Sequence, residues 1–400
     1  MESKHRTFSE FFAGIGLMRL GLERAGWKAV FANDIDADKA DMYAAHFGNE
    51  DRHFSLEDIH ALKPSEVPPA LLATASFPCN DLSLAGARKG LGGKQSSAFW
   101  GFIRILEGMG HRRPPMVLLE NVSGFLTSKK GEDFREALRA LNNLGYATDA
   151  IIIDAARFVP QSRVRLFVIG VADPIRQPKP AKQAGEDWRF FESDVRPKAL
   201  ADFIFSHPEI HWKIRDLPPL PQRDFFLPDF LEDLPDDSLC WWNDERRDYL
   251  LGQMSERHSK IVREMKARRK WSYATAFRRV RKGKSMAEIR VDGVAGCLRT
   301  PRGGSGRQIL VKAGYGKVSV RLLTPRECAR LMGADDFVIE TSLNKALFGF
   351  GDAVCVPVIE WIGENYLNPL PGEIRWAKER GRLPKTSPSS SDFRRRMSAL

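Results

Sequence analysis

Short apolar or β-branched runs alternate with helical patterns over the first 171 residues, and this alternation restricts the fold more than any other feature of the sequence. Strands are predicted at 28–32, 72–76, 116–120, 150–153 and 165–171, and helices at 17–25, 37–47 and 134–144. Such alternation is typical of a parallel sheet whose strands are joined by crossover helices. The sequence therefore predicts an α/β fold built on a mostly parallel sheet.

The alternation stops after residue 171 and returns near residue 293, which indicates a second domain between these points. This stretch begins with acidic, proline-punctuated sequence and continues as a basic block at 257–290 that contains Trp271, Tyr273 and Phe277. Such a block is typical of contact with nucleic acid, and a solvated, charged helix face is the alternative interpretation. Farther along, the pattern predicts a terminal helix at 353–366 and then a polar tail.

Charge and cysteine content restrict the partners and the compartment. The formal net charge of +11 suits a polyanionic partner, because lysine and arginine side chains that neutralise phosphates release counterions. The five cysteines form no C-x-x-C pair, so neither a zinc site nor a disulfide framework is expected. The start of the chain has no apolar core of a signal peptide, and no uninterrupted apolar run is long enough for a membrane span. We therefore expect no metal, no membrane partner and a reducing, soluble compartment.

Two glycines near the start of the chain predict a ligand-binding turn. Gly14 and Gly16 follow a short apolar run and precede an amphipathic helix, where a tight turn lets a ligand approach the backbone. The next glycine is Gly21, so the spacing is not the dinucleotide fingerprint, which disfavours a nicotinamide oxidoreductase. About twenty residues farther on, Asp34 ends a predicted strand where a carboxylate can accept hydrogen bonds from ribose hydroxyls. A helix cap is the alternative interpretation of Asp34.

An adenine ring would need apolar neighbours and a polar partner for its amine. Ile35 follows Asp34 and would offer an apolar face, although an isoleucine after a strand is usually a core residue. Asp58 and Ile59 could serve the amine and the ring at the end of a third strand, or could belong to a surface loop.

Three later segments carry side chains suited to catalysis. Cys79 follows an apolar strand at the sheet edge where open α/β folds bind ligands, and a small buried hydrophobe is its alternative interpretation. Glu120 ends another apolar strand, where a buried carboxylate is costly unless it is paired or functional. Arg163 and Arg165 occupy alternate positions, so their side chains share one face of the chain as it enters a strand.

In this order, the segments FFAGIG, NDID, SFPC, LLENV, QSRVR, RLLTPRECARLMG and GDAVCVP resemble the motifs of the DNA (cytosine-5)-methyltransferase family. The resemblance covers about residues 7–171 and 293–366. It implies a doubly wound, mostly parallel α/β sheet of the S-adenosylmethionine-dependent methyltransferase fold, with a smaller target-recognition domain. The expected division is 1–171 for catalysis and cofactor binding, 172–293 for target recognition, 294–345 for the end of the small domain and the return to the catalytic domain, 346–368 for a C-terminal helix packed on it, and 369–400 for a mobile basic tail.

The resemblance also implies S-adenosyl-L-methionine as the cofactor. The residues expected to bind it are Phe12, Gly14, Gly16, Asp34, Ile35, Asp58, Ile59, Pro78, Asp352 and Ala353. Three positions depart from the family pattern: Leu17 replaces a glycine, Asn80 a glutamine and Asp352 an asparagine.

The predicted chemistry follows from the poor nucleophilicity of carbon 5 of cytosine. Addition of the Cys79 thiolate to carbon 6 makes carbon 5 enamine-like, and the arginines Arg163 and Arg165 are expected to help ionise the thiol. Glu120 is expected to hydrogen-bond or protonate ring nitrogen 3. Carbon 6 is shielded in a stacked duplex, so the target base must be flipped out. The sequence does not identify the base that removes the carbon 5 proton.

Double-stranded DNA is the expected partner of a monomeric enzyme in the bacterial cytoplasm or on the nucleoid, with a cognate restriction endonuclease in the same system. The alternative is an RNA (tRNA) cytosine-5 methyltransferase on the same scaffold. A middle segment of 172–293 is large enough to read a duplex sequence, which favours DNA. A non-catalytic DNA-recognition protein is disfavoured because Cys79, Glu120 and both arginines are present.

Overall fold

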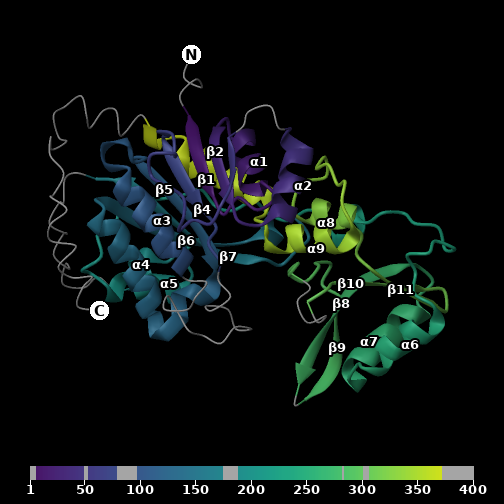
Figure 1. Ribbon diagram of the computed structural model, residues 1–400. Helices are drawn as coiled ribbons and strands as arrows, with labels where there is room; N and C mark the ends of the chain where they lie inside the picture. Colours follow the sequence, from purple (N-terminus) through teal and green to yellow (C-terminus); the bar gives the residue numbers. More distant parts are fainter. Residues whose placement is uncertain are drawn as a thin grey trace.

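A computed structural model describes residues 6–48, 53–78, 97–173, 188–281, 283–300 and 306–371 (Figure 1). A seven-stranded sheet has the order β3-β2-β1-β4-β5-β7-β6. Its strands are β1 (Thr7–Phe11), β2 (Lys28–Asp34), β3 (Phe54–Leu56), β4 (Leu72–Ala75), β5 (Met116–Val122), β6 (Tyr146–Asp154) and β7 (Val164–Ala172). All neighbours pair in parallel except β7, which is antiparallel to both β5 and β6.

The strand order reverses between β1 and β4, as in a doubly wound sheet, so the predicted fold class is confirmed. Ligands of such sheets bind where the order reverses, at the carboxyl ends of the strands. Here that edge is formed by the residues that follow Phe11 and Ala75, with Asp34 and Glu120 on the flanking strands. The five predicted strands are all present, and the strand predicted at 150–153 is extended to Tyr146–Asp154.

Helices cover both faces of this sheet (Figure 1). They are α1 (Leu17–Arg24), α2 (Ala37–Phe47), α3 (Ser97–Gly108), α4 (Glu132–Asn143), α5 (Lys198–Ser206), α8 (Pro325–Leu331), α9 (Leu343–Asp352) and α10 (Val356–Ile362). The apolar side chains of α1 and α10 share one core cluster with Phe8 and Leu72, whereas those of α3 and α4 share another with Phe11 and Ala73. Adjacent residues of one strand thus point into opposite cores, which gives the site at the strand ends support from both sides.

A second, antiparallel sheet has the order β11-β10-β8-β9. Its strands are β8 (Ser272–Arg281), β9 (Lys284–Arg290), β10 (Ile309–Gly314) and β11 (Lys317–Leu322), and α6 (Asp244–Gly252) and α7 (Glu256–Ala267) pack beside it. Leu250 of α6 and Val262 of α7 are buried against Ala274, Ala276 and the neighbouring strands. The basic block therefore forms one helix and a β-hairpin, and it is not a single charged helix face. The division of the chain into domains stays a prediction.

The helix predicted at 353–366 begins three residues later than predicted, and the stretch 346–368, predicted as one C-terminal helix, contains a break. Helix α9 ends at Asp352, Ala353 is extended, and α10 begins only at Val356. Pro357 explains the break, because a residue without an N–H is tolerated in the first turn of a helix and not in its interior. A π-helical turn, η9 (Gly363–Leu367), follows α10.

The stretch Leu343–Leu367 is long and apolar enough to cross a membrane, but 61% of its most apolar window is buried inside the protein. Gly21 of α1 lies so close to α10 that an added Cβ would come within 2.6 Å of the Ile359 Cβ. The burial is that of core helices, and their close packing completes the face of the large sheet that α1 covers.

Candidate active site

The predicted glycine turn lies directly after β1 and is fixed by Asp34. The carboxylate of Asp34 accepts a hydrogen bond from the Gly14 N–H at 2.7 Å and another from the Asp36 N–H at 2.9 Å. Phe12 and Gly14 both have positive φ, at 56° and 58°, and a Cβ added to Gly14 would meet no atom within 4 Å. The backbone of the turn is therefore open on one side, next to a carboxylate held in place by two amides.

The other residues predicted to contact an adenosine lie at the same edge of the sheet. Ile35 follows β2 and is 66% exposed, which leaves its apolar surface free for contact. Asp58 is exposed after β3, and one of its oxygens accepts the His60 N–H at 2.8 Å. Ile59 is only 4% exposed and belongs to a core cluster, so its surface for a ligand is small. Pro78 is exposed beyond β4.

Asp352 is the last residue of α9 and Ala353 follows it, next to α2. Lys39 of α2 forms an ion pair with Asp352 at 2.8 Å, and this partner could not be expected from sequence because it lies 313 positions away. Burial alone would lower the pKa of Lys39, but Asp352, Asp34 and Asp36 together raise it. The carboxylate that replaces the usual asparagine is thus already engaged by a cation.

These groups fit the chemistry of S-adenosyl-L-methionine. The open turn at Gly14 admits close approach of a ligand to the backbone, and the two oxygens of Asp34 keep lone pairs for ribose hydroxyls. The exposed side chain of Ile35 offers an apolar surface for a purine. The roles of the individual residues stay predictions.

Glu120 and Arg165 form a pair on the adjacent antiparallel strands β5 and β7. The Arg165 Nε lies 2.9 Å from a Glu120 carboxylate oxygen, and the Glu120 side chain is 9% exposed. Burial raises the pKa of Glu120, and Arg165, Arg163 and a hydrogen bond from Ser76 oppose that rise without cancelling it. A carboxyl group in this environment can take and release a proton closer to neutral pH than an exposed glutamate.

Arg163 is almost completely buried and holds distant segments together. Its guanidinium donates to the carbonyls of Leu298 at 2.8 Å, Gly351 at 3.2 Å and Ala353. Burial lowers its pKa, and the nearby Arg165 lowers it further. The two predicted arginines thus have different contacts, because Arg165 faces Glu120 while Arg163 joins β7 to the return segment and to the end of α9.

The structure adds Cys297 to this cluster, a residue that was not a candidate from the sequence. Its Sγ lies 3.4 Å from Nη1 of Arg163, and it also interacts with Arg165. Burial alone would raise the pKa of the Cys297 thiol, but Arg163, Arg165 and Arg299 lower it below its ordinary value. The segment that contains Cys297 has no strand or helix pattern, so no sequence signal placed it beside the arginines.

Gln161 attaches the segment of Cys297 to the large sheet. Its Oε1 accepts the Leu298 N–H at 2.9 Å, and its Nε2 donates to the Leu331 carbonyl at 2.7 Å. Backbone bonds between Ala295 and residues 160 and 162 add to this connection. Gln161 is fully buried, so its side chain has lost its hydrogen bonds to water. The bonds to Leu298 and Leu331 replace them.

The predicted nucleophile Cys79 and the adjacent Asn80 lie outside the described residues. The structure describes β4 and the chain as far as Pro78, which is at the carboxyl edge of the sheet between β1 and β5. Asn121, next to Glu120, donates to the Phe77 carbonyl at 3.3 Å, so β5 and the segment before Cys79 are directly connected.

Comparison with known proteins gives one consistent result. The family model described as C-5 cytosine-specific DNA methylase matches residues 6–368. The chain is 30% identical over 373 residues to the Type II methyltransferase M.DsaV of Dactylococcopsis salina, covering 92% of this chain and 88% of that protein. It is 26% identical over 367 residues to M.HhaI of Haemophilus parahaemolyticus, covering 90% of this chain and 93% of the relative.

Solved structures support the fold. The S. pombe Dnmt2 methyltransferase aligns with a TM-score of 0.59 at 19% identity, covering 92% of this chain and 99% of that one. The Entamoeba histolytica methyltransferase EhMeth aligns with a TM-score of 0.61 at 15% identity, with the same coverage. At these identities the likeness concerns the arrangement of strands and helices alone.

Proposed function

This chain belongs to the C-5 cytosine-specific DNA methylase family, and we propose that Cys79, Glu120, Arg163 and Arg165 are its catalytic residues. It is a DNA (cytosine-5)-methyltransferase, and S-adenosyl-L-methionine is its methyl donor. The observation that most supports the residue assignment is the Glu120–Arg165 pair, a largely buried acid and base at the ligand-binding edge of the sheet.

Glu120 binds and protonates the cytosine ring. A carboxyl group with a raised pKa can donate a proton to ring nitrogen 3 as negative charge enters the ring, and its other oxygen can accept from the exocyclic amine. Arg165 orients that carboxyl group through the 2.9 Å contact and limits the rise of its pKa. Arg163, directly before β7, donates to three backbone carbonyls and so holds the start of the strand that carries Arg165.

Cys79 is the nucleophile that adds to carbon 6 of the ring. Its thiolate forms a bond to carbon 6, the ring takes a proton at nitrogen 3, and carbon 5 gains enamine character. When bound, S-adenosyl-L-methionine would supply an electrophilic methyl group to carbon 5 and would leave as S-adenosylhomocysteine. Loss of the carbon 5 proton to a base then restores the double bond as the bond to Cys79 breaks, and nitrogen 3 returns its proton to Glu120, so the thiolate and the neutral methylated base are released.

The cofactor is held by the glycine turn and its neighbours. Asp34 accepts hydrogen bonds from the ribose hydroxyls, and Asp58 accepts one from the adenine amine. Ile35 packs against the adenine ring. Support comes from the open side of Gly14, the exposure of Ile35 and the fixed carboxylate of Asp34. The other contacts proposed are those of Phe12, Gly16, Ile59, Pro78, Asp352 and Ala353.

DNA is the substrate class of the family, and the finer partners are proposals. The relatives named above are Type II methyltransferases of bacteria. We infer that this enzyme acts as a monomer on cytoplasmic, nucleoid DNA and that a restriction endonuclease recognises the same sequence.

A duplex that contains 5-fluorocytosine tests the proposed chemistry. The fluorine blocks the final elimination, so the wild-type enzyme with its cofactor should form a complex with DNA that survives denaturation. Cys79→Ala should form none while it keeps cofactor affinity and fold. Formation of the resistant complex by Cys79→Ala would remove Cys79 from the reaction, and parallel incubation with transfer RNA tests the RNA alternative.

A further inference from the structure

The ion pair between Lys39 and Asp352 joins the two helices that meet at the glycine turn. Lys39 lies in the first turn of α2, and Asp352 is the last residue of α9. The Lys39 side chain is 19% exposed and the Asp352 side chain is 45% exposed. The ammonium group is therefore largely covered by the protein, whereas the carboxylate is still accessible to a ligand.

Helix α9 packs directly against the glycine turn. A Cβ added to Gly349 of α9 would come within 2.8 Å of Cγ2 of Ile15, the central residue of that turn. It would also come within 3.1 Å of the Met42 sulfur on α2. Helix α9 therefore carries Asp352 toward the edge of the sheet where the cofactor is proposed to bind.

The backbone on both sides of Asp352 is fixed independently of its side chain. Arg163 donates to the Gly351 carbonyl at 3.2 Å and to the Ala353 carbonyl. These two bonds set the position of the chain at residue 352 from the side of the catalytic cluster. The direction of the Asp352 carboxylate is a separate matter, and the 2.8 Å contact with Lys39 determines it.

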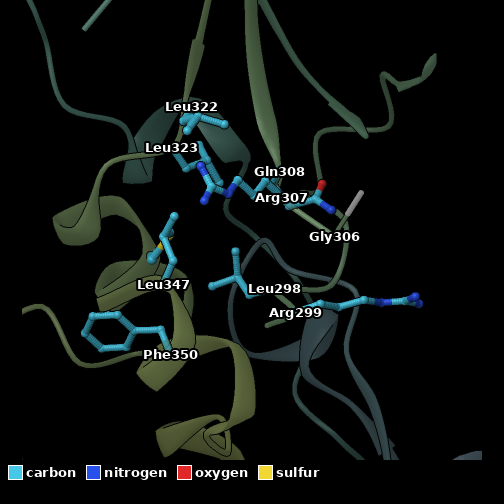
Figure 2. A pocket seen from close by; sticks show the side chains of 10 residues that line it. Leu298, Arg299, Gly306, Arg307, Gln308, Leu322, Leu323, Leu347 and Phe350 are labelled. Atoms are coloured by element: carbon cyan, nitrogen blue, oxygen red, sulfur yellow. The ribbon is translucent and has the colours of Figure 1, made fainter. Parts of the chain in front are cut away.

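Helix α9 is also packed against the return segment. Residues of both segments line one small cavity, namely Leu298, Arg299, Leu347 and Phe350 (Figure 2). A Cβ added to Gly351 would come within 2.5 Å of the Arg299 backbone, so the end of α9 has no room to shift toward it. A change at Lys39 should therefore act on the Asp352 side chain and leave the helix in place.

Lys39 is surrounded by acidic groups of the cofactor edge. Asp36 accepts the Lys39 N–H at 3.2 Å and itself donates its N–H to Asp34. Burial opposes the charged form of Lys39, but Asp352, Asp34 and Asp36 together raise its pKa. An uncharged side chain at position 39 would leave the Asp352 carboxylate near two others without this cation, and like charges repel.

We propose that Lys39 is a positioning residue of the cofactor site, which orients Asp352 and offsets its charge so that a carboxylate can replace the asparagine of the family pattern. An amide both donates and accepts hydrogen bonds, whereas a carboxylate only accepts. The ammonium of Lys39 supplies the donor and the charge balance that Asp352 lacks. This inference rests on the proposed function, because it takes the cofactor to bind at the glycine turn.

The test compares Lys39→Met with Lys345→Met. Lys345 of α9 pairs with Asp38 of α2 at 2.7 Å, so it joins the same two helices, but it lies near the opposite end of α9 from Asp352. Calorimetry measures the affinity of each variant for S-adenosylhomocysteine, which carries no sulfonium charge. Lys39→Met should weaken this affinity by about tenfold, and Lys345→Met should bind as the wild type does.

The double variant Lys39→Met with Asp352→Asn separates positioning from a general effect on the fold. An asparagine at position 352 needs no cation, so the double variant should recover to within about threefold of the wild-type affinity. A double variant as weak as Lys39→Met would overturn the proposal, and so would equal affinity of Lys39→Met and the wild type. Wild-type protein that binds no S-adenosylhomocysteine would instead contradict the proposed function, on which the inference rests.

Discussion

Glu120 is proposed to donate one proton to the cytosine ring. Glu120→Gln keeps the size and hydrogen-bonding capacity of the side chain but cannot donate a carboxyl proton to the ring. We expect turnover to fall by about 10²- to 10⁴-fold, the usual contribution of a general acid. Single-turnover methylation with saturating DNA measures this loss, and calorimetry should show unchanged affinity for the cofactor product. A variant with near-normal turnover would show that Glu120 only supports the fold.

Cys297 should influence the pH dependence of that step. Arg163 and Arg165 lower the pKa of the Cys297 thiol, and wherever the thiol is ionised it neutralises part of their charge, so Cys297→Ser leaves the arginines freer to stabilise ionised Glu120. The pKa of Glu120 then falls, and the pH at which turnover declines should move to lower values. The pH profile of turnover measures this shift. Cys240→Ser is the control, because Cys240 is exposed, and an identical profile for Cys297→Ser would contradict the prediction.

Glu10 should make stability depend on pH. Burial raises its pKa from 4.5 to about 8, although Arg19 opposes the rise, and neither carboxylate oxygen has a hydrogen-bond partner in the described structure. Between these values Glu10 is protonated in the folded protein and ionised in the unfolded chain, so stability falls as pH rises. From about pH 6 to pH 8 the wild type should lose about 2 kcal/mol more than Glu10→Gln. Urea unfolding at both pH values measures the difference.

Some residues of the candidate site could be predicted from the sequence, and others could not. Glu120 could be predicted because a carboxylate at the end of a strand as apolar as β5 requires a reason, and Arg165 because QSRVR leads into the neighbouring β7. Lys39 could not be linked to Asp352, because the pair depends on how α2 and α9 meet in three dimensions. Cys297 was missed for the same physical reason: its partners come from another part of the chain.

At the scale of elements, the periodic patterns of the large sheet were sufficient and the irregular segments were not. Helix α2 begins and ends where it was predicted, because Asp36 caps its first turn and Gly48 follows its last residue. The break between α9 and α10 was missed in the single helix predicted over 346–368, because an apolar run that includes Pro357 still has helical periodicity. Pro357 lies in the first turn of α10, where a proline is tolerated. The helix therefore begins at Val356, three residues after the predicted start.

Gln161 connects elements, and its loss should weaken the whole catalytic edge. Gln161→Ala leaves the Leu298 N–H and the Leu331 carbonyl buried without partners, at a cost of about 2 to 4 kcal/mol in the free energy of unfolding. Urea denaturation followed by circular dichroism measures this cost. Gln222→Ala, at an exposed position, is the control and should change stability little. Equal stability of the two variants would mean that water or another group satisfies the two backbone atoms.

At the scale of the whole molecule, the small sheet limits how sequence recognition can be transferred. Strands β8 and β9 lie before residue 293, but β10 and β11 lie after it and belong to the same sheet. Replacing 172–293 with the matching segment of a relative should therefore give an unstable protein. A replacement extended to Leu322 should fold and methylate the donor's target. Bisulfite sequencing of a methylated random duplex library measures the outcome, and unchanged site preference would place recognition elsewhere.

The packing of α10 on α1 has a consequence for synthesis on the ribosome. Trp27, just after α1, donates to Asn368 at 2.9 Å, although the two residues are 341 positions apart. Throughout translation of the intervening chain, the part of α1 that contacts α10 has no cover. A nascent chain must therefore wait, with this surface exposed to chaperones and proteases, until its last described helix emerges.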